Sequence, residues 1–315
     1  MTKSNKNRLN ERLIAAGTIL TLLIILLCCA GCPHNDVPPI LEYKGEPYIP
    51  ERGDKEKLSF ENRVIVEQRA KKVQAELETL QEHPWAGSYD IHSGVPPVGK
   101  YRFLIAPKSG YIYTSNSDDW VDAYGGVLYD QNYGGATWEN DRLKLSPVLK
   151  NEDNGYYNPG TEFVLIPWEE RLYLVPADGI VEFCNAVNSG WVHYFSRGGN
   201  WKHPEGKPDV PDNFKPYLLE TPIEGQVIAL GKTEDVQRGE YRGQPWMLKE
   251  TTVTINKGKQ DGLLSGMKFY VMDSEFSEWI ELTDVSETES EGIFTWRDER
   301  SAPQTGWSVS TTSRW

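Results

Sequence analysis

From Trp85 onward the chain alternates apolar and polar residues in short segments, and this pattern constrains the fold more than any other feature of the sequence. Such alternation places successive side chains on opposite faces of a β-strand. Turns rich in Gly, Asn and Pro separate the segments, as at residues 107–110 between segments 101–106 and 111–115. The sequence therefore predicts a mainly β protein built from antiparallel hairpins.

The strand candidates form two groups. The first group is 101–106, 111–115, 126–129, 142–145, 162–167 and 171–175, and it predicts an antiparallel meander that closes into a barrel or sandwich. A short helix over 179–188, capped by Asp178 and ended by Gly190, is expected next. The second group predicts six strands, at 226–230, 251–256, 267–272, 279–285, 292–296 and 307–311.

One amphipathic helix is expected before the strands. Residues 60–82 contain no Gly or Pro, Ser59 offers an N-cap, and Pro84 follows the helix. The apolar positions recur at spacings of four and three, at Val66, Ala70, Val73, Leu77 and Leu80. This stripe predicts packing on the following β domain, with a dimeric coiled coil as the alternative.

Composition divides the chain into five regions. Residues 1–31 are expected to be a signal peptide and 32–58, which hold five Pro, a tether. Residues 59–195 are predicted to form a helix plus an antiparallel β domain. A Pro- and Gly-rich linker over 196–222 precedes a final β domain at 223–315.

The amino terminus has the parts of a secretory signal. Four basic residues within the first twelve precede an apolar run over 13–31. The stretch 27–32, Leu-Cys-Cys-Ala-Gly-Cys, resembles the bacterial lipobox, which implies that Cys32 carries acyl chains such as palmitate and anchors the chain to a membrane. Pro33 in place of Asp implies, by the same resemblance, the outer membrane facing the periplasm. An uncleaved transmembrane anchor is the alternative, and the C-x-x-C of 29–32 also has the spacing of a redox or zinc pair.

Two further resemblances concern the β regions. Residues 253–267 resemble a small SH3-like β-barrel, a fold that recurs in bacterial envelope assembly proteins. Residues 85–89, Trp-Ala-Gly-Ser-Tyr, resemble the Gly-x-Trp start of lipocalin-like barrels with Trp and Gly in reversed order. The first resemblance implies a fold rather than an activity.

Charge excludes some partners. Residues 1–31 carry a net charge of +3, so residues 32–315 carry −16 against −13 for the whole chain. Such an acidic chain gives no electrostatic reason to bind nucleic acid or an anionic lipid surface. With Cys32 lipidated, Cys184 is the one cysteine left in residues 32–315, so no disulfide within that part of the chain is expected.

Candidate chemical groups are few, and the sequence carries no esterase elbow, zinc-protease helix, P-loop or dinucleotide fingerprint. Cys184 and His193 are a candidate nucleophile and base, although the apolar neighbours of Cys184 favour a core position. His193 with His203 is a candidate metal pair. Two acidic loops are candidate calcium sites, although solvated loops are the simpler interpretation. The first loop contains Asn116, Asp118, Asp119 and Asp122, and the second is residues 151–154. Gly258, Gly262 and Gly266 allow a weak phosphate-loop hypothesis. No cofactor or metal is expected.

These observations favour a membrane-anchored envelope lipoprotein that acts as a non-catalytic binding or assembly module. Its expected partners are the membrane, through the lipid anchor, and another envelope protein. A lipocalin-like binder of a small ligand or glycan is the first alternative, because aromatic residues are frequent after Trp85. An enzyme of unrecognised class is the second.

Overall fold

A computed structural model describes residues 68–91, 100–121, 127–147, 161–198, 204–241, 244–274, 278–297 and 299–314, all of which belong to one compact unit, Leu58–Trp315. These residues form two closed antiparallel barrels with few short helices, which confirms the predicted mainly β fold class. The expected signal peptide, Cys32 and the tether lie outside the described residues.

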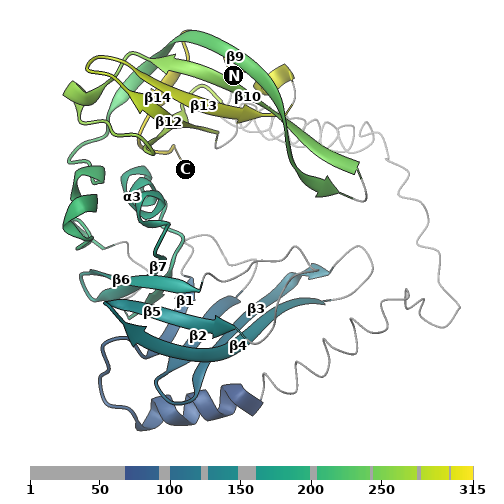
Figure 1. Ribbon diagram of the computed structural model, residues 1–315, viewed down its shortest axis with the longest axis vertical. Helices are drawn as coiled ribbons and strands as arrows, with labels where there is room; N and C mark the ends of the chain where they lie inside the picture. Colours follow the sequence, from purple (N-terminus) through teal and green to yellow (C-terminus); the bar gives the residue numbers. More distant parts are fainter. Residues whose placement is uncertain are drawn as a thin grey trace, which may run out of the picture. The chain divides into compact units, whose positions relative to one another are not determined.

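The first barrel is an up-and-down meander of eight strands (Figure 1). The strands are β1 (Gly87–Ile91), β2 (Lys100–Ala106), β3 (Gly110–Val121), β4 (Val127–Glu139), β5 (Arg142–Pro147), β6 (Glu162–Trp168), β7 (Arg171–Pro176) and β8 (Phe195–Arg197). Each strand pairs with the next, and β8 returns to β1, where Asp90 faces Ser196. The predicted meander is therefore closed by its shortest strand.

Aromatic rings fill the interior of this barrel. The ring of Phe103 lies 4.9 Å from that of Tyr113 and 4.8 Å from that of Phe195, measured between centroids. Tyr89 is also fully buried, and its hydroxyl donates to the Trp85 carbonyl at 2.8 Å. Side chains from all eight strands and from Trp85 thus form one packed core.

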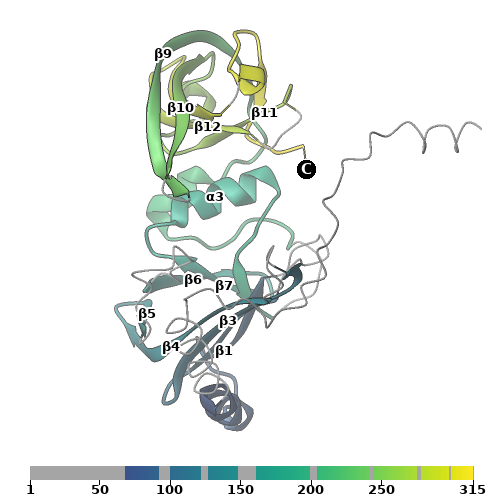
Figure 2. The ribbon, with the colours of Figure 1, turned by 90° about the vertical axis from the view of Figure 1, so that its right-hand side faces the viewer.

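The outer face of β2–β4 is apolar as well, and a helix over 68–79 covers it (Figure 2). Val73 is fully buried against Ile112 and Tyr133, whose side chains point away from the barrel interior. The Glu76 carboxylate accepts the backbone N–H groups of Lys108 and Ser109 at 3.0 and 2.7 Å. Over the described part of the helix, this packing confirms the predicted contact with the β domain.

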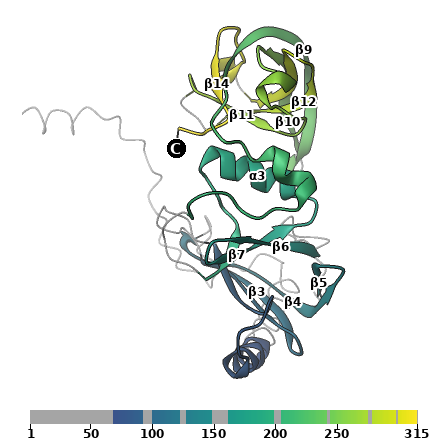
Figure 3. The same ribbon diagram turned by 90° about the vertical axis from the view of Figure 1, so that its left-hand side faces the viewer.

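A second helix, α3 (Ile180–Ser189), covers the outer face of β6 and β7 (Figure 3). Phe183 packs against Tyr173 at 5.5 Å between ring centroids, while Leu174, the next residue on β7, points into the barrel. The alternation of β7 therefore serves two cores, one inside the barrel and one beneath α3.

The second barrel has six strands, the number predicted from the sequence. They are β9 (Glu224–Tyr241), β10 (Gln244–Ile255), β11 (Lys268–Val271), β12 (Trp279–Val285), β13 (Ser290–Trp296) and β14 (Ser308–Ser310), in the sheet order β10-β13-β12-β11-β14-β9. Its core includes Val253, Phe269 and Phe294. Short 3-10 helices occur at η1 (Asp212–Tyr217), η2 (Lys259–Asp261) and η3 (Glu299–Ser301).

Several details differ from the sequence prediction. β1 was not among the predicted strands, and β4 continues to Glu139, well beyond the predicted segment 126–129. β8 crosses the boundary expected at 195/196, because a three-residue strand is too short to show alternation. β9 and β10 are much longer than segments 226–230 and 251–256. Their outer part is a two-stranded hairpin with largely exposed side chains, including Trp246 and Met247.

We expect Phe103→Ala to lower the free energy of unfolding by about 3–5 kcal/mol, because it leaves a cavity among packed rings. Tyr101→Ala is the matched control, since Tyr101 lies on the same strand and is 40 % exposed, and it should change stability by about 0.5 kcal/mol or less. Urea unfolding followed by circular dichroism measures both values. Equal losses for the two variants would contradict the assignment of Phe103 to the barrel interior.

Candidate functional site

The candidate site lies along α3, a helix whose ends are set by glycine. Gly190 has φ 79° and donates its N–H to the carbonyls of Ala186 and Val187, which confirms the predicted end of the helix. The predicted cap by Asp178 is wrong, because Gly179 is the N-cap residue and no side chain caps the helix. The reason is a turn in which the Gly179 N–H donates to the Pro176 carbonyl at 2.9 Å, so that the helix begins beyond Asp178.

Asn185 joins α3 to the second barrel. Its side-chain amide donates to the Gly266 carbonyl at 2.8 Å, and its side-chain oxygen accepts the Lys268 N–H at 3.2 Å. Gly266 has φ 86°, and a Cβ at this position would lie 3.2 Å from a methyl of Val181. Glycine therefore permits both the left-handed turn and the close approach of this turn to α3.

Asn188 makes a second connection from the same helix. Its amide donates to the Tyr217 carbonyl at 2.8 Å, and its side-chain oxygen accepts the Leu219 N–H at 3.0 Å. The Thr312 hydroxyl donates to the Asn188 carbonyl at 3.2 Å. Two asparagines thus fix α3 against backbone groups on several segments.

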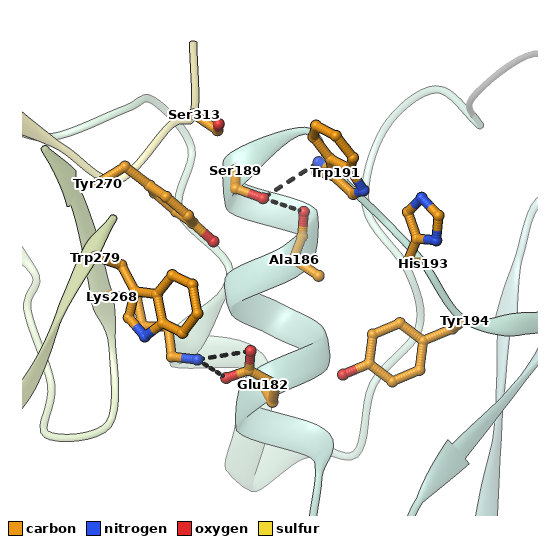
Figure 4. A pocket seen from close by; sticks show the side chains of 10 residues that line it. All are labelled: Glu182, Ala186, Ser189, Trp191, His193, Tyr194, Lys268, Tyr270, Trp279 and Ser313. Carbon is orange, nitrogen blue, oxygen red and sulfur yellow. Dashed lines mark hydrogen bonds and ion pairs between the residues drawn. The ribbon is translucent and has the colours of Figure 1, made fainter. Parts of the chain in front are cut away.

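A cleft of about 350 Å³ runs beside α3 (Figure 4). Glu182, Ala186 and Ser189 follow one another at spacings of four and three, so they lie on one face of the helix and line the cleft from this side. Figure 4 places the side chains of the second barrel on one side of α3 and those of the segment after α3 on the other. These flanking residues are Lys268, Tyr270 and Trp279, and Trp191, His193 and Tyr194, with Ser313 nearby.

Two tryptophans give the cleft its apolar surface. Trp191 is 41 % exposed and Trp279 is 48 % exposed, although indole rings bury well in protein cores. The Trp191 ring stacks on that of His193 at 5.6 Å between centroids. The Lys268 ammonium lies 4.9 Å from the centroid of the Trp279 ring. Each indole therefore has a neighbour that limits its movement while a large part of its surface stays accessible.

An ion pair provides the charges of the cleft. The Lys268 ammonium lies 2.7 Å from both carboxylate oxygens of Glu182. The Lys268 side chain is 10 % exposed and the Glu182 side chain 53 %, so the cation is enclosed and the carboxylate faces solvent. The two charges cancel, and the carboxylate still has lone pairs available for a ligand.

Tyr270 contributes a neutral hydroxyl. Burial is the largest influence and raises the pKa of this side chain, while a hydrogen bond with Ser189 lowers it and the nearby Glu182 carboxylate raises it. The net direction is upward from the ordinary value. The hydroxyl therefore keeps its proton at neutral pH and acts in hydrogen bonds rather than as a base.

Cys184 lies in the core beneath α3, as the apolar neighbours in its sequence predicted. It is fully buried, and its thiol points to the Phe214 carbonyl at 4.0 Å. Burial raises the pKa of this thiol to about 12. The thiol is thus protonated at neutral pH, whereas a nucleophilic cysteine needs its thiolate.

The other candidate residues do not assemble into a site in the described part of the chain. His203, Asp122 and residues 151–154 lie outside the described residues, and for Asn116, Asp118 and Asp119 on β3 only the backbone is described. Among described residues, no group of three or more His, Cys, Asp or Glu is placed to hold a metal ion.

The spaced glycines form a turn closed by a carboxylate. Gly258 precedes η2 and donates its N–H to the Asp261 carboxylate at 3.0 Å, and Lys257 pairs with the same carboxylate at 3.0 Å. The Gly258 hydrogen bond and then the Lys257 contact lower the Asp261 pKa. The Asp261 carboxylate therefore occupies the Gly258 N–H, which would have to bind the phosphate in a phosphate loop.

A larger hollow of about 720 Å³ lies near the end of the helix over 68–79 and the β6–β7 turn. Its main cation, Arg197, donates to the carbonyls of His83, Pro84 and Ala86. This guanidinium holds the connection between the helix and β1. We therefore assign Arg197 a structural role.

Sequence reasoning missed the cleft. The helical spacing of Glu182, Ala186 and Ser189 was visible in the sequence, as was a tryptophan directly after the Gly190 helix end. Trp279 and Lys268 lie far along the chain from α3, however, and no local pattern indicates that they come together there. The hydrogen bonds of Asn185 and the ion pair of Lys268 with Glu182 bring β11 to this helix.

Comparison with protein-family models, with curated proteins and with solved structures found no match to this chain. In the described ranges, no helix combines the length and the apolar character needed to cross a bilayer. The two barrels thus define the fold of the chain without placing it in a family.

We expect Asn185→Ala to lower the free energy of unfolding by about 1–3 kcal/mol, because it leaves the Gly266 carbonyl and the Lys268 N–H without their partner. Glu182→Gln, on the same helix, should cost less than about 1 kcal/mol, because the side chain of Glu182 is largely exposed. Chemical unfolding midpoints of the two variants and the wild type make the comparison. A smaller loss for Asn185→Ala than for Glu182→Gln would contradict the role of this amide.

We expect the Cys184 thiol of the folded protein to react very slowly with iodoacetamide at pH 8, and rapidly in urea. Because its folded-state pKa of about 12 lies above the unfolded-state value, its contribution to stability is complete below the unfolded-state pKa and is lost as the pH rises from there through about 12. Mass spectrometry of the peptide that contains Cys184 measures the modification separately from the other cysteines. Equal rates in buffer and in urea would show that the thiol is accessible.

Proposed function

We propose that the chain is an exported bacterial lipoprotein, attached to the envelope through Cys32, and that it acts as a non-catalytic binding module through the cleft beside α3. The observation that carries the binding role is the pair of half-exposed tryptophans on a frame fixed by partly buried hydrogen bonds. Exposed aromatic side chains held in place lose little conformational entropy when a ligand binds. The cleft therefore supports binding better than the other described hollow does.

Three titratable groups of α3 and β11 favour binding over catalysis. The Glu182 carboxylate is engaged by Lys268, Tyr270 keeps its proton, and the Cys184 thiol lies in the core. A catalytic base or nucleophile needs a reactive protonation state within reach of the substrate. These groups instead offer fixed hydrogen-bonding partners.

The location rests on the amino-terminal sequence. The basic segment, the apolar run and the Ala-Gly-Cys sequence ending at Cys32 support export and acylation. Pro33 favours the outer membrane facing the periplasm. The six-stranded second barrel supports the further proposal that this region is related in fold to the SH3-like barrels of envelope assembly proteins.

The alternative of a lipocalin-like binder places a ligand inside the first barrel. Packed aromatic side chains, including Phe103, Tyr113 and Phe195, occupy that interior. A ligand there would have to displace them at a large cost in packing energy. We therefore place the binding role in the cleft.

One experiment in a diderm bacterium tests both parts of this proposal. We expect mass spectrometry of the wild-type protein to show a chain that begins at an acylated Cys32. The Cys32→Ser variant should lack the acyl chains and lose membrane association, yet part of it should still sediment with envelope fragments. Adding Trp191→Ala and Trp279→Ala should release that part.

Trp246→Ala, added to Cys32→Ser, is the matched control, because Trp246 is 46 % exposed on the β9–β10 hairpin, away from the cleft residues. It should leave sedimentation unchanged. A wild-type product that retains Met1 and carries no added hydrocarbon would overturn the lipoprotein proposal. Equal sedimentation with and without the two cleft substitutions would overturn the binding role of the cleft.

A further inference from the structure

We propose that the cleft beside α3 binds a neutral glycan, with sugar rings stacked on Trp191 and Trp279 and their hydroxyls bonded to Glu182 and Tyr270. This inference rests on the proposed binding function and names the class of its ligand. The cleft volume of about 350 Å³ lies at the lower end of the range of small-ligand pockets, roughly 300–1,000 Å³. A ligand about the size of a disaccharide fits this volume.

The aromatic surfaces of the cleft suit the face of a sugar ring. A pyranose ring presents a face of C–H groups, which carry small positive charge, whereas the face of an indole is negative. The two surfaces are complementary in shape and in charge. Trp191 and Trp279 both line this cleft, each leaves more than two fifths of its surface accessible to solvent, and each is backed by a neighbouring side chain. They lie on the two sides of α3, so a ligand that contacts both must cross the helix (Figure 4).

The polar groups of the cleft suit the hydroxyls of a sugar. The exposed carboxylate of Glu182 can accept hydrogen bonds from neighbouring hydroxyls, while Lys268 holds it in place from the enclosed side. The hydroxyl of Tyr270 stays protonated. Because the Glu182–Lys268 pair is neutral in sum, a ligand with its own strong charge would meet no compensating charge in this pair. The pattern therefore favours hydroxyl groups over phosphates or carboxylates.

The strand pairing disfavours an extended peptide. Peptides often bind by adding a strand to a free sheet edge. β11 is paired on both sides, with β12 and β14, and β12 is paired with β11 and β13. The two strands that supply Lys268, Tyr270 and Trp279 thus use both of their edges within the barrel, and they present side chains to the cleft. A hydroxyl-rich ligand can be bound through side chains alone, without a free strand edge.

The test is a titration of the full-length protein, solubilised in a mild non-ionic detergent without a sugar headgroup, with chitotetraose, cellotetraose and maltotetraose. Isothermal titration calorimetry measures binding, and intrinsic tryptophan fluorescence reports on the indole rings. We expect saturable binding of at least one oligosaccharide. Trp191→Ala and Trp279→Ala should each weaken it by about tenfold or more, since a buried aromatic contact commonly dominates binding energy. Glu182→Gln should weaken it as well.

Trp246→Ala is again the matched control and should leave the affinity unchanged, and urea midpoints show that each variant is folded. The proposal is overturned if none of the three sugars binds, if binding survives both tryptophan substitutions, or if a proline-rich peptide binds the cleft in their place. If the cleft substitutions release the protein from envelope fragments but no sugar binds, only the glycan assignment fails. If sugars bind but the two tryptophan substitutions do not change sedimentation with envelope fragments, the proposed function fails instead.

Discussion

The first barrel has strands that are apolar on both faces, and the rest of the structure depends on this property. Phe103 and Tyr113 point into the barrel. Ile112 on β3 and Tyr133 on β4 point outward, so their apolar surface must be buried by another element. One helix covers this outer patch and α3 covers another, over β6 and β7. Burying the second patch fixes the position of α3, because the apolar area removed from water is the main favourable term in folding.

The position of α3 in turn creates the candidate site. A helix that packed with only one face would leave its opposite face to solvent, but Asn185 and Asn188 bond to backbone groups of other segments. Buried amide contacts of this kind are directional and specify one arrangement rather than many. The cleft is what remains between these contacts, and its geometry is set by Asn185 and Asn188, which do not line it, together with the Glu182–Lys268 ion pair, which does.

Much of the fold could be predicted from the sequence, and the reasons for success and failure are physical. Alternation revealed most strands because each has one face in a core, and Gly190 marked the end of α3 because it adopts a left-handed conformation. β1 and β8 were missed, since strands of five and three residues carry little or no period. The outer part of β9 and β10 was missed because largely exposed strands need no apolar alternation. The candidate site could not be predicted, since it joins α3 to Lys268 and Trp279 through contacts that no local pattern encodes.

The outer part of the β9–β10 hairpin has a consequence for the behaviour of the protein in solution. In the described residues, the ladder between β9 and β14 runs only from Glu224 to Gln226, so most of β9 pairs on one side alone. Such a strand is a template on which another chain can assemble. Charged residues along it, including Lys232, Glu234, Asp235 and Arg238, make stacking of identical copies unfavourable. Concentrated samples should therefore be most prone to fibrous aggregation where salt screens these charges.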